Sequence, residues 1–376
     1  MTTQTTHREN SPPRIMPGTA RQFVFKLHLY TGLLIGLLLV LSGLSGSVLV
    51  FRDEIEAVAY PELLVTAARG ERIAVDEVLQ RVRRAYPVDL PFAIRMPRTP
   101  QQTYMVKLNG AHDLFVYVDP YSGSILGAQR QMDFPTGWIS LLHTQLLSGE
   151  AGETALGIGA LLLVGLCVTG LVLWWPRNGK ISRGFKVQWS ARWKRLNFDL
   201  HRASGVYAAL LLLLTASTGA AFVFNKTATG LVDTVTASAP RAAPPRALPS
   251  PEGMPTRALD TLLHQADRVL TAPTTWISLP QTPQAPLVVR KRLPHELHSN
   301  GRNFVYLNQY SGNVIQVEHA LSAPLGTRVF NTFYPLHIGA IGGTPTRTMQ
   351  VVVGLAPTLL LVSGFVMWKS RKKGNY

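Results

Sequence analysis

The chain has 376 residues, of which 46% are hydrophobic and only 15% charged, and its formal net charge is +16. This length allows several domains. The single cysteine, Cys167, excludes disulfides within the chain and clusters of thiolate metal ligands, and we interpret it as a small buried residue.

Four apolar stretches without charged residues divide the chain, at 27–51, 155–175, 203–225 and 348–368. Each exceeds 20 residues, roughly the length that crosses a hydrocarbon core about 30 Å thick. Helices satisfy their own backbone polar groups in lipid. We therefore predict an integral membrane α-helical protein, a four-helix transmembrane bundle with helices at 27–51, 155–175, 201–225 and 348–368. The first stretch is too long for the apolar part of a secretion signal and lacks a convincing cleavage site.

Basic residues set the predicted orientation. The N-terminal tail (1–26), the loop at 176–200 and the C-terminal tail (369–376) are all rich in Arg and Lys. The positive-inside rule places all three in the cytoplasm, as parts of a multi-pass membrane protein. These segments account for much of the positive charge, so membrane lipid is an expected partner and nucleic acid is not.

Two external segments, 52–134 and 226–327, repeat each other. Ala74–Leu79 and Ala258–Leu263 share the pattern of a short amphipathic helix, and Tyr117–Gly123 and Tyr306–Gly312 share that of a strand–turn–strand hairpin. We predict two external α+β modules, produced by an internal duplication, with a loop in the Pro- and Ala-rich run 237–255. Interfacial helices are predicted to follow the modules at 135–154 and 328–347.

Two histidines open transmembrane segments at repeated positions. His28 and His201 differ by 173 in number, and each is followed four residues later by a glycine, Gly32 or Gly205. Residues four apart share a helix face. A bare glycine there would let a flat ring lie against the helix backbone below the imidazole, and Thr31 and Ser204 offer hydroxyls near the same level.

A second pair, His143 and His337, lies upstream of the other two segments. Each is followed by glycine after 6 and 27 residues and by tryptophan after 31 residues, namely Gly149, Gly170 and Trp174, and Gly343, Gly364 and Trp368. The Ser148-Gly149 and Gly342-Gly343 dipeptides predict a break before each crossing helix. This pair is expected at the outer ends of its helices.

Four histidines tied to membrane helices predict metal ligands, and haem iron is a metal that two imidazoles commonly hold. We predict two haems at different depths, one bound by His28 and His201 and the other by His143 and His337. Covalent c-type attachment is excluded because no Cys-x-x-Cys-His motif exists. The competing interpretation is that these are polar interfacial residues. His295 and His298 are also able to contact a metal, but the first half lacks counterparts, so we predict no site there.

These motifs together resemble a known family, the PepSY-associated transmembrane proteins, which are bacterial iron-regulated inner-membrane proteins. The resemblance rests on the His-x-x-[Thr/Ser]-Gly openings, the paired Tyr-Ser-Gly hairpins and the Leu-His segments, from about Arg21 to Lys373. Within the family the chain is most similar to the siderophore reductases of the ferrioxamine B type. That similarity implies haem b and reduction of a ferric siderophore on the periplasmic side.

The functional hypothesis is an oxidoreductase in iron acquisition. Electrons from a cytoplasmic or membrane donor would cross both haems and reduce a ferric siderophore docked between the external modules, releasing Fe(II). Trp138, Phe333 and Tyr334 are candidates for bordering that docking site. Three alternatives stay open: a siderophore transporter or permease without redox chemistry, a sensor or binding module, and a di-haem electron carrier to another protein or a quinone. No glycine-rich nucleotide motif indicates a flavin or nicotinamide site.

Overall fold

The computed structural model describes residues 18–110, 113–176, 181–239, 245–246 and 255–372. The chain forms two compact units. We call residues 1–47, 142–224 and 348–376 the helical unit and residues 48–141 and 225–347 the sheet unit. Most of the N-terminal tail (1–26), most of the Pro- and Ala-rich run (237–255) and the end of the C-terminal tail (369–376) lie outside the described residues.

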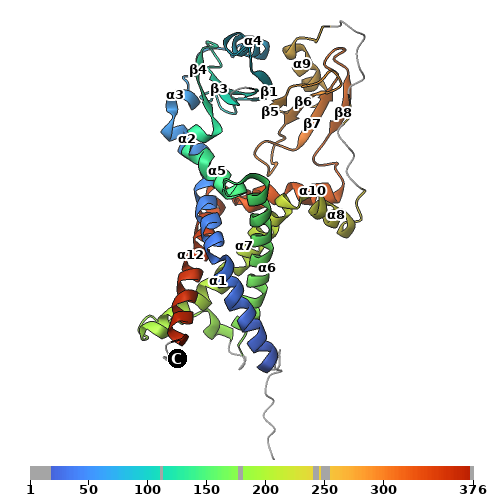
Figure 1. Ribbon diagram of the computed structural model, residues 1–376. Coiled ribbons are helices and arrows are strands. Elements are labelled where there is room, and N and C mark those ends of the chain that lie inside the picture. Colours follow the sequence, from blue (N-terminus) through green and yellow to red (C-terminus); the bar gives the residue numbers. More distant parts are fainter. Residues whose placement is uncertain (1–17, 111–112, 177–180, 240–244, 247–254, 373–376) are drawn as a thin grey trace, which may run out of the picture. The chain divides into compact units, whose positions relative to one another are not determined.

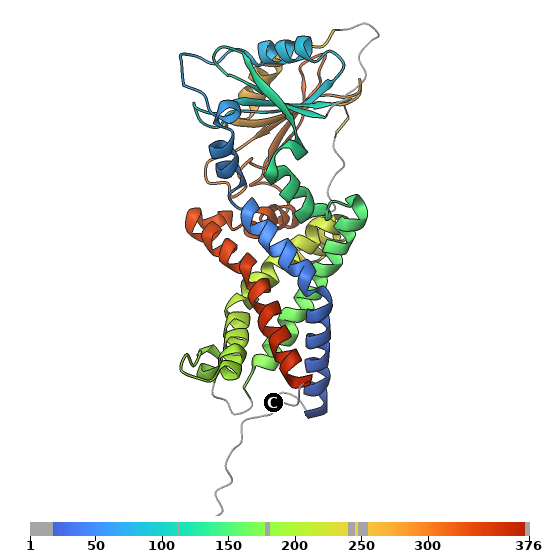
Figure 2. The same cartoon turned by 60° about the vertical axis from the view of Figure 1, so that its left-hand side comes forward.

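The helical unit contains four helices long and apolar enough to cross a membrane (Figures 1 and 2). Each begins several residues before the apolar stretch from which it was predicted, and α12 also continues beyond the end of its stretch. A helix satisfies its backbone hydrogen bonds internally and has no need to begin where the apolar residues begin. A short 3-10 turn, Ile181–Phe185, precedes the third helix. The four helices are α1 (Gly18–Leu49), α6 (Gly149–Trp174), α7 (Trp193–Val223) and α12 (Thr344–Lys372).

Small residues bring the four helices into close contact. Where α1 meets α12, a Cβ atom added to Gly354 would lie 2.8 Å from the Gly43 carbonyl oxygen, and the Ser47 hydroxyl donates to the Val351 carbonyl at 3.1 Å. Between α6 and α7, a Cβ added to Gly157 would lie 2.6 Å from a Val223 methyl. Such close backbone approach is typical of helix packing in membranes. Cys167 is buried in this bundle, as predicted.

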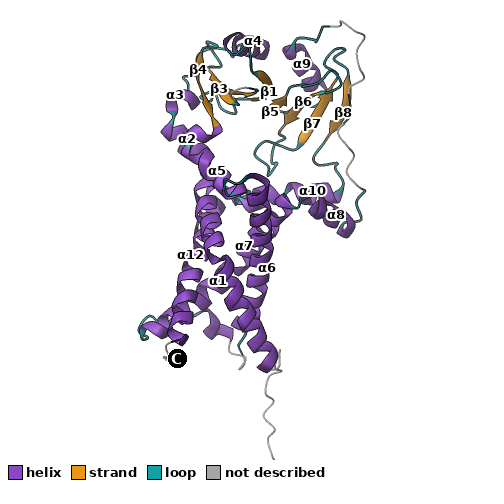
Figure 3. Cartoon of the chain, viewed as in Figure 1, coloured by secondary structure: helices purple, strands orange, loops and turns teal. Residues whose placement is uncertain are grey.

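The sheet unit is built on one antiparallel sheet of eight strands in the order β4-β3-β2-β1-β5-β6-β7-β8 (Figure 3). Each half is a four-stranded meander, and β1 pairs with β5 with Ile94 opposite Ile277. The α+β character of the two predicted modules is confirmed, and the pairing of β1 with β5 joins them into one continuous sheet. Each of β1 and β5 would be an edge strand in its own half. By pairing with each other, they satisfy main-chain N–H and C=O groups that a free edge would leave unpaired. The strands are β1 (Leu90–Arg95), β2 (Tyr104–Asn109), β3 (Leu114–Val118), β4 (Ile125–Arg130), β5 (Thr274–Ser278), β6 (Leu287–Lys291), β7 (Asn303–Leu307) and β8 (Val314–Glu318).

The two faces of the sheet carry different cores. Helices α4 (Val75–Ala85) and α9 (Leu259–Val269) pack on one face with alternate strand residues such as Val106 and Val289. The intervening residues Met105 and Tyr117 point to the other face, where they pack with Leu63 and Phe134. This two-residue alternation is that of a strand buried on both sides. The helices α2 (Arg52–Ala59) and α3 (Pro61–Leu64) lead into this second core.

The two helices on the first face cap each other. The Asp76 carboxylate accepts hydrogen bonds from the main-chain N–H groups of Leu259 and Asp260 at 2.8 and 2.9 Å. The Asp260 carboxylate accepts from those of Val75 and Asp76 at 3.0 and 2.9 Å. Each helix N-terminus, which lacks intrahelical partners and favours negative charge, is thus satisfied by the other half of the unit.

The predicted breaks before the crossing helices are confirmed. Leu146 and Leu147 adopt φ values of 47° and 57° between α5 (Pro135–Gln145) and α6, and Gly343 has φ 69° just before α12. The predicted interfacial helices are shorter than 135–154 and 328–347. The second is divided because Pro335 has no N–H to continue the preceding helix. Its parts are α10 (Leu325–Asn331), α11 (Phe333–His337) and a 3-10 turn (Ala340–Gly342); the remaining elements are α8 (Asn225–Val235) and a 3-10 turn at Gln131–Asp133.

Candidate site of paired histidines

The structure brings His28 of α1 and His201 of α7 together inside the helical unit. Their ring centres are 6.5 Å apart and the ring planes are nearly perpendicular, at 88°. A metal–imidazole nitrogen bond is about 2 Å long and each nitrogen lies about 1 Å from its ring centre, so two imidazoles on opposite sides of one metal ion would have centres roughly 6 Å apart. The observed separation suits a shared metal ion.

The hydrogen bond of His28 identifies the nitrogen that carries its proton. His28 Nδ1 lies 2.9 Å from the Thr169 hydroxyl on α6. That hydroxyl already donates its own proton to the Gly165 carbonyl at 2.7 Å. It must therefore accept from Nδ1–H, which leaves the lone pair on Nε2. Histidines that bind metals commonly donate their other ring N–H in this way.

His201 repeats the arrangement on the other pair of helices. Its Nδ1 lies 2.8 Å from the Ser363 hydroxyl on α12, and that hydroxyl donates to the Leu359 carbonyl at 2.6 Å. Nδ1 again carries the proton and Nε2 the lone pair. Both imidazoles are thus held as neutral rings with the same tautomer, which is the form that coordinates a metal.

Glycines surround the two rings. A Cβ added to Gly170 would lie 3.2 Å from Cε1 of His28, and one added to Gly364 would lie 3.4 Å from Cε1 of His201. The predicted glycines, Gly32 and Gly205, are more open, since an added Cβ would meet only Leu166 at 3.8 Å or Leu360 at 3.6 Å. Open backbone beside the imidazoles fits a flat porphyrin, so the residues present suit haem.

Sequence reasoning missed the two hydroxyls. Thr169-Gly170 and Ser363-Gly364 lie at equal distances after His143 and His337, so the repeat contained the signal. The hydroxyl that was singled out instead, Ser204, donates to the Leu200 carbonyl of its own helix at 2.6 Å. It therefore does not orient a histidine.

His143 occupies a second level of the helical unit. Its Nδ1 lies 3.0 Å from the Ser42 carbonyl and 3.2 Å from the Ser45 hydroxyl, and its Cε1 would lie 2.8 Å from a Cβ added to Gly46. The pattern of a bonded Nδ1 and a glycine against the ring is that of His28 and His201. Because α1 rises 1.5 Å per residue, Ser45 lies about 25 Å along the helix from His28.

His337, the fourth predicted ligand, belongs to the sheet unit. It is the last residue of α11 and is half-buried. His143 and His337 lie in different units, so their pairing stays a prediction. Trp138, one of the residues predicted to border a docking site, is 44% exposed, whereas Phe333 packs on Phe330 with ring centres 5.0 Å apart.

The third such residue, Tyr334, stacks on His298 with ring centres 5.0 Å apart and an interplanar angle of 25°. Burial, followed by the charges of Arg290 and neighbouring arginines, lowers the pKa of His298 to about 3. Among the described residues no group of three or more His, Cys, Asp or Glu is arranged to hold a metal ion.

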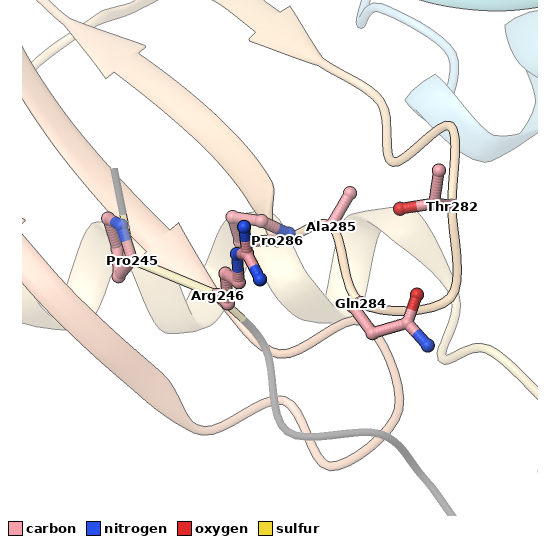
Figure 4. Close-up of a pocket in the computed structure, with 6 residues that line it drawn as sticks. All are labelled: Pro245, Arg246, Thr282, Gln284, Ala285 and Pro286. Atoms are coloured by element: carbon pink, nitrogen blue, oxygen red, sulfur yellow. The ribbon is translucent and has the colours of Figure 1, made fainter. Parts of the chain in front are cut away.

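A shallow hollow in the sheet unit offers no comparable chemistry (Figure 4). Gln309 fixes the adjoining loop by donating from Nε2 to the carbonyls of Thr282 and Ala285, both at 3.1 Å. Arg246 is the one charged side chain among the six that line the hollow, which are Pro245, Arg246, Thr282, Gln284, Ala285 and Pro286. A binding site normally brings several polar groups to one point.

Comparison with known proteins gives one family. The model of the PepSY-associated TM region matches residues 25–371, nearly the whole chain. A search of curated proteins found no match.

Proposed function

We propose that this chain, which belongs to the PepSY-associated TM family, is a di-haem b oxidoreductase that carries electrons across the bacterial inner membrane to a ferric siderophore. One observation carries the proposal: His28 and His201, from different helices, face each other with ring centres 6.5 Å apart. Two imidazoles close both axial positions of a haem iron and favour electron transfer over oxygen binding. When bound, haem supplies a centre that gains and loses one electron.

The protein's contribution at this level is orientation. The Thr169 and Ser363 hydroxyls hold the Nδ1–H groups of His28 and His201, so each Nε2 lone pair stays directed away from its hydroxyl partner. Both rings are half-buried among apolar helices, and neutral imidazole is the form that coordinates a metal. These properties would let the iron change charge without losing its ligands.

The second haem is proposed at the level of His143, with His337 as the other ligand. Support comes from the hydrogen bonds of His143 Nδ1 with Ser42 and Ser45. His28 and His201 are likewise hydrogen-bonded through Nδ1. The axial separation of about 25 Å is most of a hydrocarbon core about 30 Å thick. Two haems at these depths would divide the distance across the membrane, which is too long for a single electron-transfer step, into shorter steps.

The halves of the chain are proposed to derive from a duplication. Each half has the same element order of helix, meander and helix, and Asp76 and Asp260 make matching caps across the sheet unit. The basic segments support a proposed orientation with both termini in the cytoplasm and the sheet unit in the periplasm.

The chemical step requires no protein nucleophile. One electron leaves a cytoplasmic or membrane donor, such as a quinol, and arrives on the Fe(III) of a siderophore, which becomes Fe(II). Siderophores offer hard, charged oxygen ligands that prefer Fe(III), so the lower charge weakens the chelate and releases the metal. The duplicated four-helix bundle also leaves little room for a transport pathway.

The test begins with the visible spectrum of the full-length protein purified in detergent, oxidised and dithionite-reduced, with haem counted per chain. We expect six-coordinate b-type bands and about two haems per chain. His28→Ala and His201→Ala should each remove one haem, whereas His264→Ala, on α9, should remove none. A colourless protein from haem-replete cells would refute the proposal. A haem-loaded protein that fails to reduce ferric siderophores, yet reduces a quinone, would favour the electron-carrier alternative.

A further inference from the structure

The sheet unit carries a cluster of arginines around His298. Arg290 on β6 lies with Nη2 3.3 Å from His298 Nδ1, and its Nε donates to the Gly301 carbonyl at 2.8 Å. Arg98, from the loop after β1, hydrogen bonds through Nη2 to the Asn300 side chain. Tyr334 stacks on the His298 ring. We call Arg98, Arg290, Arg292, Arg302, His298 and Tyr334 the arginine cluster.

The four arginines of this cluster outnumber the acids that act on Arg290 and Arg98, which are Glu296 and Asp53. In the part of the chain that the structure describes, Arg98, Arg290 and Arg292 form no ion pair with a carboxylate. Glu296, the acid within the loop, instead accepts from the main-chain N–H groups of Leu293 and Arg302 at 2.6 and 2.8 Å. Asp53 attracts Arg98 electrostatically without pairing with it. Like charges held this close favour an added anion.

The titration behaviour agrees with this geometry. Burial lowers the pKa of Arg290 to about 10, and the charge of Arg302 adds to the effect. His298 is 9% exposed and accepts a hydrogen bond from the Asn300 N–H at 3.2 Å on Nδ1, so it is neutral and adds no charge of its own. The surroundings repel a metal cation and attract a group with several anionic oxygens.

We propose that the arginine cluster binds an anionic ferric chelate of the hydroxycarboxylate class, which would be the substrate of the reductase. This inference rests on the proposed function. Arg98 and Arg292 are exposed and Tyr334 is 42% exposed, so guanidinium and hydroxyl donors are accessible from solvent. Guanidinium groups bind carboxylates through paired, charge-assisted hydrogen bonds. Tyr334 also precedes His337 by three residues, one turn of α11, which places the cluster next to the proposed outer ligand.

Binding is tested with gallium(III) citrate, a redox-inert chelate of the same class, added to the full-length protein in detergent and followed by calorimetry. We expect saturable binding that weakens as salt is raised, because screening weakens charge interactions at exposed sites. Arg98→Gln and Arg292→Gln should each raise the Kd about tenfold, since one charge-assisted hydrogen bond commonly contributes that much, and Arg98→Lys should raise it less. Arg83→Gln, an equal charge change at an exposed position of α4, should leave the Kd unchanged.

Several outcomes would overturn the proposal: no binding by the wild type, an equal effect of Arg83→Gln, or preferential binding of the cationic gallium complex of ferrioxamine B. Competition by vesicles of anionic lipid, but not by citrate, would assign the cluster to a lipid headgroup instead. The His28→Ala variant separates this proposal from the previous one. It should lose a haem and still bind gallium citrate, so the anion site and the redox function can fail independently.

Discussion

Replacement of Ser363 by alanine tests how the first histidine pair is oriented. Ser363 accepts the Nδ1–H of His201 at 2.8 Å, and the same ring also hydrogen bonds to the main chain of Leu360. Alanine would remove the hydroxyl acceptor and leave the ring N–H with the Leu360 main chain alone. The cost of a fully unsatisfied buried donor, about 1–3 kcal/mol, is the upper limit of the effect. A free-energy change of 1.4 kcal/mol alters an equilibrium constant by a factor of about ten. Loss of such an orienting partner typically reduces metal affinity about 10–100-fold, so we expect haem binding to weaken within that range.

The assay is transfer of haem from the detergent-purified protein to excess apomyoglobin, followed by visible absorbance. One of the two haems should leave about 10–100-fold faster in Ser363→Ala. Ser204→Ala is the matched control, because Ser204 bonds its own helix at the Leu200 carbonyl. Ser363→Thr should restore slow loss, since threonine occupies the equivalent position, Thr169, beside His28. Equal loss rates in Ser363→Ala and Ser204→Ala would refute the reasoning.

Three further predictions concern packing, pH and capping. Gly43→Leu should lower the Tm in detergent or prevent assembly, because the new Cβ would meet the Gly354 carbonyl. The control Gly165→Leu should do neither, since a Cβ added at Gly165 has no atom within 4 Å. Burial, then the Arg290 charge, lowers the pKa of His298 from 6.5 to about 3. As the pH falls, the unfolded chain therefore binds this proton before the folded protein does. The free energy of unfolding should fall between pH 6.5 and pH 3, by at most about 1.4 kcal/mol per pH unit. Hydrogen exchange of residues 287–307 at pH 7.5 and 5.5 measures this, and His298→Phe should abolish most of the difference. Asp260→Ala should cost about 1 kcal/mol of unfolding free energy in urea titrations and Asp260→Asn less, because asparagine still accepts the capping hydrogen bonds.

The helices and the first histidine pair were predictable because both depend on local patterns. Runs of apolar residues specify membrane helices in any context, and a repeated His–Gly spacing marks a helix face. The predicted helix ends were wrong by several residues, since polar residues extend a helix without entering the apolar core. Thr169 and Ser363 escaped notice because hydroxyls are common in membrane helices, and their role depends on which helix lies opposite.

The sheet unit was less predictable because its key contact is distant in sequence. The repeats predicted two α+β modules but not how they meet, and the pairing of β1 with β5 joins them, with Arg95 opposite Trp276. The same pairing carries Arg98, which follows β1, toward Asn300 in the loop between β6 and β7. A cluster assembled from both halves in this way has no signature within either half.

The repeated architecture also explains why an anion site would exist in one half only. In the first module residues 110–113 join β2 to β3, whereas in the second residues 292–302 join β6 to β7 and contain Arg292, His298 and Arg302. In the proposed function an electron path needs equivalent ligands in both halves, which would account for the repeated histidines. A substrate would need one place to dock, beside one end of that path. The longer loop, next to α11 and His337, would then supply the part of the proposed function that symmetry cannot provide.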